Sequence, residues 1–184
     1  KPMTKIFSGS LLPLSGHSVS IKLVCDSMLI EGMSEEKYIE QMVSFYDAKK
    51  TGKGNEWKQK WENYRHSAFE KTFFNSLSVA SSGSNVKWTN DTVSDFVIRV
   101  QVTAIINQAT MSDEDENASP AEQIGTITVL HSISTVNNRT GEQICVLSCD
   151  NVPGGPSFDD CQRVLGCFSR LGTELGKMVM KKYR

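Results

Sequence analysis

The sequence predicts an α+β fold in which a mainly antiparallel sheet carries helices on one face. Strict alternation of apolar and polar residues over 18–25 and 95–108 predicts two strands. Apolar residues at steps of three and four over residues 157–183 predict a long closing helix. The order of strand, two helices, three-strand meander and helix is typical of α+β proteins, where helices cover one side of an antiparallel sheet.

Length and charge limit the classes of function. A chain of 184 residues is expected to form one domain, 1–184, with a core of its own. The net charge of −1 and pI of 6.4 argue against a nucleic-acid-binding surface. No run of about 18 apolar residues is present, so no membrane span is predicted. The first residue is Lys1 rather than Met, which suggests a removed secretory or lipid-bearing leader, although any trimmed chain would begin in the same way.

The first half of the chain is expected to contain one strand and two helices. Residues 1–17, with scattered Gly and Pro, are expected to be an irregular lead-in. The strand at 18–25 follows. Ser34 is a candidate N-cap for a first helix, because Glu35 and Glu36 suit the positive end of the helix dipole. A polar stretch ends that helix, and a second helix is predicted over residues 57–77.

The second half is expected to supply the rest of the sheet. The alternation at 95–108 is the longest in the chain and predicts a central strand. Residues 109–123 are acidic and without periodicity, which predicts a mobile loop. The other predictions are a short edge strand at 86–89, strands at 124–136 and 143–149, and a hairpin loop at 137–141.

The cysteines indicate core positions rather than chemistry. Cys25, Cys145, Cys149 and Cys161 fall on the apolar phase of predicted elements, where a free cysteine behaves as a small hydrophobic residue. Cys167 lies off the main apolar stripe of its helix and is predicted to be the most exposed thiol.

Two motifs that suggest ligand binding fail on inspection. Residues 51–55 read TGKGN, but a phosphate-binding loop needs a longer spacing, a preceding strand and a following hydroxyl residue. Asp113, Asp115 and Asn117 alternate as in a calcium-binding loop, yet Ala118 and Ile124 replace the required Gly and Glu.

Catalytic and metal-binding patterns are also missing. His17, His66 and His131 are far apart, and none lies three or four residues from another His or a Cys. No nucleophile motif is present. Carboxylates at strand ends could still converge in space, so the sequence leaves an enzyme open but favours a protein without catalytic residues, metal or cofactor.

Aromatic residues and glycines leave open whether partners bind. If exposed, the aromatic residues would mark a partner-binding patch, although the core interpretation is favoured. Gly172 and Gly176 flatten one side of the closing helix, where a strand or a second chain could approach, or where ordinary packing occurs. The candidate partner-binding residues are Trp57, Trp61, Tyr64 and Trp88.

Three short motifs carry a resemblance to bacterial envelope proteins. The run IKLVCDSM, the turn NRTGEQI and the ending ELGKMVMKKY resemble the TolB amino-terminal domain and the assembly lipoproteins related to the curli secretion protein. Asp26, Thr140 and Gly141 occupy the matching positions. The segments GKGNEWKQKW and FEKTFFNSL also resemble uncharacterised lipoprotein-like proteins of gut anaerobes. The helical region at 34–77 departs from the first group.

The resemblance implies a periplasmic or outer-membrane location and a scaffold or assembly role, and it transfers no catalytic residue. The leading hypothesis is therefore an exported, non-enzymatic domain, tethered by a lipid on a removed leader or free, which binds a protein or envelope partner. The alternative is a small-molecule-binding protein or hydrolase with a site between the sheet and the helix at 57–77. A third option is a homo-oligomer that associates through its sheet.

Overall fold

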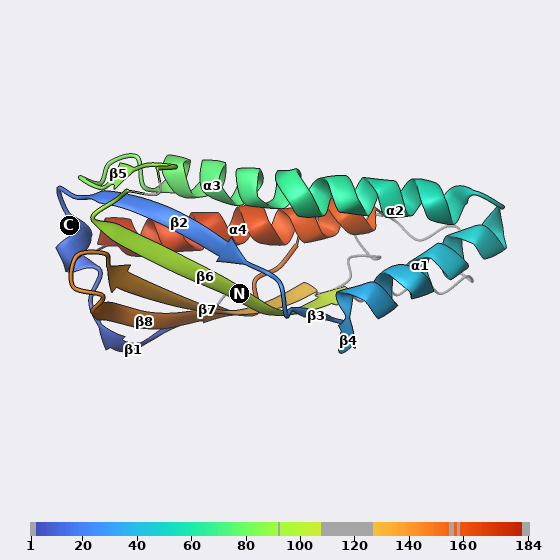
Figure 1. Cartoon of the computed structure of the whole chain (residues 1–184), viewed down its shortest axis with the longest axis horizontal. Helices are drawn as coiled ribbons and strands as arrows, with labels where there is room; N and C mark the ends of the chain where they lie inside the picture. The colour runs from blue at the N-terminus through green and yellow to red at the C-terminus, as the bar shows by residue number, and fades with distance from the viewer. Residues whose placement is uncertain (1–2, 92, 108–126, 155–156, 158, 182–184) are drawn as a thin grey trace.

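The computed structural model describes residues 3–91, 93–107, 127–154, 157 and 159–181, with the backbone alone at 3, 107 and 127–134. It confirms the predicted α+β class, with a sheet of eight strands and helices on one face (Figure 1). The expected acidic loop at 109–123 lies outside the described residues.

The meander and its central strand form as predicted. In the main path of the sheet the order is β1-β8-β7-β6-β2-β5, and β3 pairs with β4 and β6. Antiparallel pairs join β6 to β7, β7 to β8 and β8 to β1. The strands are β1 Met3–Gly9, β2 Ser18–Val24, β3 Leu29–Ile30, β4 Met33–Ser34, β5 Lys87–Trp88, β6 Phe96–Asn107, β7 Ile127–Asn137 and β8 Gln143–Asp150.

The prediction of an irregular lead-in at 1–17 is wrong for most of this segment. It contains β1 and a short 3₁₀ helix, η1 (Leu12–Leu14). Among the described strands β1 pairs with β8 alone, and residues 4–9 are all exposed. Since neither face is buried, selection for alternating apolar residues is absent, and the sequence pattern does not reveal the strand. Gly9 ends it with φ of 74°, where a Cβ would lie 1.8 Å from the Ile144 carbonyl oxygen.

Parallel pairs make the sheet mixed. The strand β2 runs parallel to β6 and to β5, and β3 runs parallel to β6. The helical segment between β2 and β6 returns the chain to the same end of the sheet before β6 begins, which is how a parallel pair is connected. The alternation pattern reports which face a residue takes and carries no information on strand direction.

The helical region is longer than predicted and contains a π-helical turn. α1 (Glu35–Lys49) begins after Ser34, whose Oγ accepts the Lys37 backbone N–H at 3.3 Å, as the N-cap prediction required. α2 (Lys53–Asn63), the π turn η2 (Tyr64–Ala68) and α3 (Phe69–Ala80) then form one helical run. α1 and the start of α2 extend beyond the end of the sheet (Figure 1).

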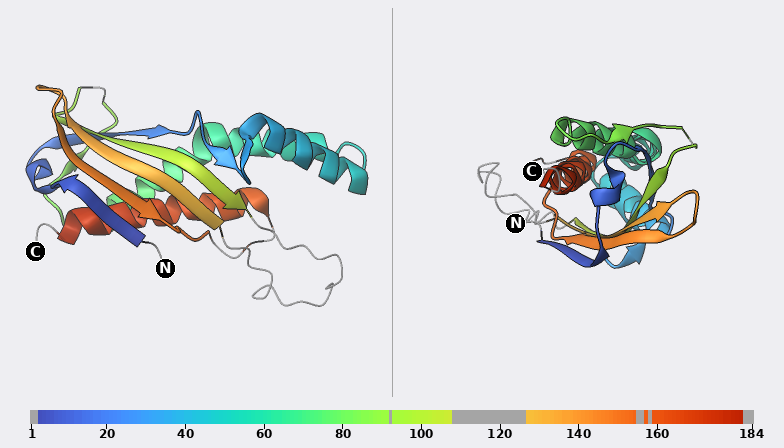
Figure 2. Two further views of the ribbon diagram at one scale, coloured as in Figure 1. Left: turned by 90° about the horizontal axis from the view of Figure 1, so that it is seen from below. Right: turned by 90° about the vertical axis from the view of Figure 1, so that its left-hand side faces the viewer.

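The closing helix α4 (Asp160–Lys181) lies between the sheet and α3 (Figures 1 and 2). A Cβ on Gly172 would lie 2.2 Å from the Phe73 carbonyl oxygen, and one on Gly176 would lie 2.6 Å from the Ala80 Cβ. The two glycines therefore allow close approach of α3, which is ordinary helix packing and involves neither a strand nor a second chain.

The core fills the space between the sheet and the α3–α4 pair. Ile98, Val100 and Val102 point into it, whereas Arg99 and Thr103 are exposed on the opposite face of β6. The expectation of an exposed Cys167 is wrong, because its side chain is fully buried. Since α4 packs against both the sheet and α3, its buried arc is wider than a single stripe.

Candidate functional site

The candidate aromatic residues at the start of the helical run belong to the core. Trp57 is 7% exposed and Trp61 is fully buried. Their rings stack with centroids 5.7 Å apart, and Tyr46 stacks on the other side of Trp57 at 6.0 Å. The favoured core interpretation is thus confirmed for both tryptophans, which build no exposed patch.

Tyr64 and Trp88 are half-buried and lie apart. The Tyr64 hydroxyl accepts a hydrogen bond from Gln162 Nε2 at 2.5 Å, and Trp88 Nε1 donates to Ser81 Oγ at 2.7 Å. Trp88 belongs to β5, at the end of the molecule opposite α2 (Figure 1). The four predicted residues therefore do not form one binding surface.

A buried polar group, which we call the helix-junction network, joins α1 to the start of α4. Its members are Tyr46, Asp160 and Arg163. The Tyr46 hydroxyl donates to Asp160 Oδ2 at 2.7 Å, and the Arg163 guanidinium forms an ion pair with Asp160 Oδ1. Arg163 Nη1 also donates to the Ser157 carbonyl oxygen at 2.8 Å. Burial and the bond to Asp160 raise the pKa of Tyr46, so this hydroxyl stays a donor.

A neighbouring pair reinforces the same junction. Lys60 forms an ion pair with Asp159. Burial alone would raise the pKa of Asp159, but the hydrogen bonds from Lys60 and from the Gln162 backbone lower it overall. Asp159 Oδ1 accepts the Gln162 backbone N–H at 3.1 Å, as an N-cap residue does. These contacts fix the start of α4 against α2.

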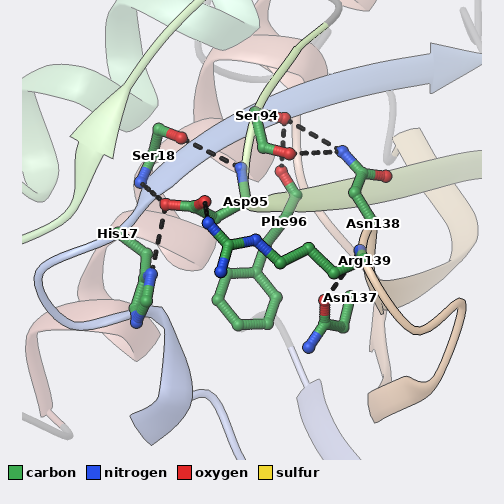
Figure 3. A network of polar contacts seen from close by, with 8 residues as sticks. All are labelled: His17, Ser18, Ser94, Asp95, Phe96, Asn137, Asn138 and Arg139. Carbon is green, nitrogen blue, oxygen red and sulfur yellow. Dashed lines mark hydrogen bonds and ion pairs between the residues drawn. The ribbon is translucent and has the colours of Figure 1, made fainter.

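A second polar group, the sheet-end cluster, lies where β2 and β6 begin (Figure 3). Its centre is Asp95, whose Oδ2 lies 3.1 Å from His17 Nδ1 and accepts the Ser18 backbone N–H at 3.2 Å. Asp95 Oδ1 lies 3.7 Å from Arg139 Nη2 in the β7–β8 hairpin loop. The Asp95 backbone N–H in turn donates to Ser18 Oγ at 2.9 Å.

Ser94 and Asn138 complete the sheet-end cluster. Asn138 Nδ2 donates to the Ser94 carbonyl oxygen at 2.7 Å, and Ser94 Oγ donates to the Phe96 carbonyl oxygen at 2.8 Å. The Asn138 backbone N–H donates to the Asp95 carbonyl oxygen at 3.1 Å. The cluster therefore fastens three segments that are distant in the sequence.

The chemistry of this cluster is that of an orienting pair. When Nδ1 of His17 donates to Asp95, Nε2 is left as an acceptor. A histidine oriented by a carboxylate in this way corresponds to the base and the carboxylate of a catalytic triad. A hollow of about 300 Å³ opens beside it, lined by Pro13, Phe96 and Asn137 among others. Among the described residues, however, no hydroxyl or thiol is hydrogen-bonded to the His17 ring, so the nucleophile position is unfilled.

Sequence reasoning did not find this cluster. His17 and Asp95 are 78 positions apart, and each residue alone looks like loop chemistry. The side chain of His131, another of the three histidines, lies outside the described residues. Within the part of the chain that the structure describes, no group of three His, Cys, Asp or Glu residues converges as a metal site would require.

Burial makes four of the five cysteines poor nucleophiles. Burial raises the pKa of Cys25 to about 11 and those of Cys149 and Cys161 to about 12. The same cause raises the pKa of Cys167 further. Since the thiolate is the reactive form, these thiols are unreactive near neutral pH.

A third surface feature, the edge groove, lies between β2 and the helical run. It is a hollow of about 470 Å³. The π turn η2 supplies His66 and Ser67, α3 supplies Glu70, Lys71, Phe73, Phe74 and Asn75, β2 supplies Ile21, and Asn90 follows β5. Its position agrees with the predicted site between the sheet and the helix at 57–77, although neither Trp57 nor Trp61 lines it.

Comparisons with known proteins show no family. No protein-family model and no curated protein matches the sequence. Among solved structures, the PelC dodecamer of Paraburkholderia phytofirmans has a TM-score of 0.44 at 8% identity, covering 97% of each chain. A variant of that dodecamer has a TM-score of 0.36 at 10% identity, covering 93% of this chain and 97% of the other. With both TM-scores below 0.5, neither likeness shows a shared fold or function. None of the described helices is long and apolar enough to cross a bilayer.

Proposed function

We propose that this protein is a non-enzymatic assembly domain, which binds other protein chains through the uncovered edge of its sheet at β1. The observation that carries the proposal is the exposure of that strand. Ile6 is 39% exposed and Phe7 is 59% exposed, and in the sheet as described β1 has a neighbour on one side only. A free edge presents unpaired N–H and C=O groups, so it is a template for another strand.

The sequence of β1 fits a second copy of itself. In an antiparallel pair centred on Ile6, the two isoleucines face each other and Lys5 lies close to Phe7, which forms a bulge where β1 pairs with β8. Lys5 Nζ already lies 4.9 Å from the Phe7 ring centroid within one chain, so the cation and the ring are suited to contact. Cross-strand pairs of this kind contribute favourably to strand association. The partner that the strand fits is therefore the same strand of a second molecule.

The cellular setting is part of the proposal. The short motifs that resemble envelope assembly proteins support a periplasmic or outer-membrane-associated location, and an assembly role fits strand pairing. Fractionation of cells that express the natural gene tests this setting. Recovery of the protein only in the cytoplasm would contradict the location without affecting the strand contact.

Light scattering after size-exclusion chromatography tests the strand contact. We expect the unaltered protein to dimerise with rising concentration, and Ile6→Lys/Phe7→Lys to stay monomeric, because Lys5 and the two new lysines of one strand would face the same three cations of the other. The control is Leu12→Lys, which alters an apolar residue that is 52% exposed outside the strand. A protein that is monomeric at every concentration, or a double variant that still dimerises, would overturn the proposal.

A hydrolase or small-molecule-binding protein remains the second candidate, because the edge groove carries His66, Ser67 and Glu70. In the described residues no hydrogen bond joins these three side chains to one another, so no activated nucleophile is assembled. Cleavage of p-nitrophenyl esters tests the hydrolase. Activity that disappears in Ser67→Ala would support it, and absence of activity would remove it.

A further inference from the structure

We infer that the edge groove binds an extended peptide segment of a partner protein, which adds to the free edge of β2 as a further strand. This site is separate from β1, so the inference stands independently of the assembly proposal. It rests on the direction of backbone groups in β2, on the side chains that line the groove, and on the charges at its rim.

Among the described residues, none outside β6 forms a backbone hydrogen bond with Ile21 or Leu23 of β2. The His17 and Val19 carbonyl oxygens accept the backbone N–H groups of Lys87 and Thr89, each at 3.0 Å, so both carbonyls face β5. In a parallel ladder, alternate residues direct their N–H and C=O groups to the same neighbour. Ile21 and Leu23 therefore face the same side as Val19.

β5 ends too early to pair with those groups. It is aligned only with Ser18 and Val19, and no other described strand lies next to β2 on that side. The N–H and C=O groups of Ile21 and Leu23 consequently project past the end of β5 and into the position of a missing strand. An extended peptide there would pair with them and lengthen the sheet.

Side chains beside this edge form a receptor for one face of such a peptide. Ile21 and Leu23 are half-buried against the core, and Ile21 lines the hollow together with the half-buried Phe74 and the fully buried Phe73 of α3. The volume of about 470 Å³ lies within the range of ligand sites. The lining is mixed, with Ile21 and Phe74 as its partly exposed apolar side chains beside polar ones such as Asn75. An added strand directs alternate side chains to one face, so every second residue of the peptide would enter this hollow.

The π turn shapes one wall of the groove. A π-helical turn widens the helix locally, and such turns occur frequently at functional sites. Here η2 contributes His66 and Ser67 to the rim, one turn before Glu70 and Lys71. The helical run thus departs from regular α geometry where it passes β2.

The charges indicate a peptide without net charge. Glu70 and Lys71 give the rim one acidic and one basic group, and neither forms an ion pair with a described residue. Opposite single charges do not attract a strongly charged ligand. The occupant is therefore an extended, uncharged segment with an apolar residue, held by backbone hydrogen bonds and by burial of that residue, and we expect weak dependence on salt.

Peptide display tests the inference with a defined probe. A random peptide library displayed on phage is panned against the purified full chain, and enriched peptides are synthesised for anisotropy titrations. Hydrogen exchange then locates the bound strand. We expect the amides of Ile21 and Leu23 to gain protection when an enriched peptide binds.

Two substitutions test the groove in different ways. Leu23→Pro removes an N–H that faces the groove and not β6, so the β6 pairing is retained while affinity falls by about tenfold. Asn75→Trp fills the hollow with a large ring, and the matched control Asn63→Trp places the same ring on an exposed position of α2 outside the groove. Circular dichroism confirms that each variant is folded.

The outcomes separate the two proposals. Three results would each overturn the groove assignment. The first is that no enriched peptide binds, and the second is that affinity is unchanged in both groove variants. The third is that a bound peptide protects the amides of β1 from hydrogen exchange in place of those of Ile21 and Leu23. Dimerisation measured by light scattering should be the same in Asn75→Trp as in the unaltered protein, because β1 is not affected. Loss of dimerisation in Ile6→Lys/Phe7→Lys with peptide binding retained would support both assignments.

Discussion

Two aspartates in this protein have the same kinds of neighbour and opposite surroundings. Asp160 lies between the Tyr46 hydroxyl and Arg163, and Asp95 lies between the His17 ring and Arg139. The side chains of Arg163 and Asp160 are 3% and 7% exposed, whereas those of Arg139 and Asp95 are 85% and 33% exposed.

The types of residue in a polar cluster therefore do not by themselves decide its role. A buried ion pair must satisfy both charges inside the protein, because water cannot replace a missing partner. An exposed pair loses little when one partner is removed, since water and salt screen the remaining charge. The helix-junction network is therefore structural, and the sheet-end cluster has groups that a ligand or solvent can reach.

Removal of an arginine should give the largest contrast. Arg163→Met leaves the Asp160 carboxylate buried without its cation, and we expect it to lower the free energy of unfolding by about 3–5 kcal/mol. Arg139→Met is the matched change at the sheet-end cluster and should leave the urea midpoint nearly unchanged. Urea unfolding followed by tryptophan fluorescence measures both.

A double variant tests whether the unpaired charge of Asp160 causes the loss of stability. In Asp160→Asn/Arg163→Met no buried charge is left unpaired, so part of the lost stability should return. Equal losses of stability in Arg163→Met and Arg139→Met, or a double variant no more stable than Arg163→Met, would contradict the assigned contrast.

Removal of the Tyr46 hydroxyl or the His17 ring nitrogen that contacts each aspartate should have an intermediate effect on stability. Tyr46→Phe deletes the hydroxyl that donates to Asp160 Oδ2 and should cost about 1.5–3 kcal/mol, the range for hydrogen bonds to charged groups. His17→Phe removes the corresponding donor to Asp95 in an exposed setting, where the loss should be smaller. Thermal unfolding of the two variants side by side compares them, and a larger loss at His17 would reverse the ranking.

The smallest expected effect is the pH dependence of the stability that Asp95 contributes. Hydrogen bonds from the Ser18 backbone and from His17 lower the pKa of Asp95. Its contribution to stability is then fully present above the unfolded-state pKa, about 3.9, and is lost as the pH falls through the lower folded-state pKa.

The matching variant is Asp95→Asn, which has no carboxylate to protonate. It should be slightly less stable than the unaltered protein at pH 7, and the difference should narrow as the pH falls below about 4. Thermal unfolding across this pH range measures the difference. If the difference in stability between Asp95→Asn and the unaltered protein widens on acidification, the assigned direction of the Asp95 pKa shift is wrong.

The sequence located most elements of the fold from burial patterns. The alternation in β6 follows from one covered and one solvated face, and the Ser34 N-cap was confirmed by its bond to Lys37. The same reasoning missed β1, whose side chains are exposed on both faces, and misjudged Cys167, since a helix covered on two sides buries more than one stripe. Periodicity reports burial, so it fails where burial does not follow a single face.

The candidate sites were beyond reach for a different reason. Contacts such as His17 with Asp95 join residues 78 positions apart, and the edge groove exists because β5 stops two residues into its pairing with β2. The class of fold and the buried faces of most elements could be predicted from the sequence, because these depend on local propensity and hydrophobic period. Which strand edges stay free, which aspartate is buried and where a groove opens depend on pairings between distant segments, so these features follow from the three-dimensional structure alone.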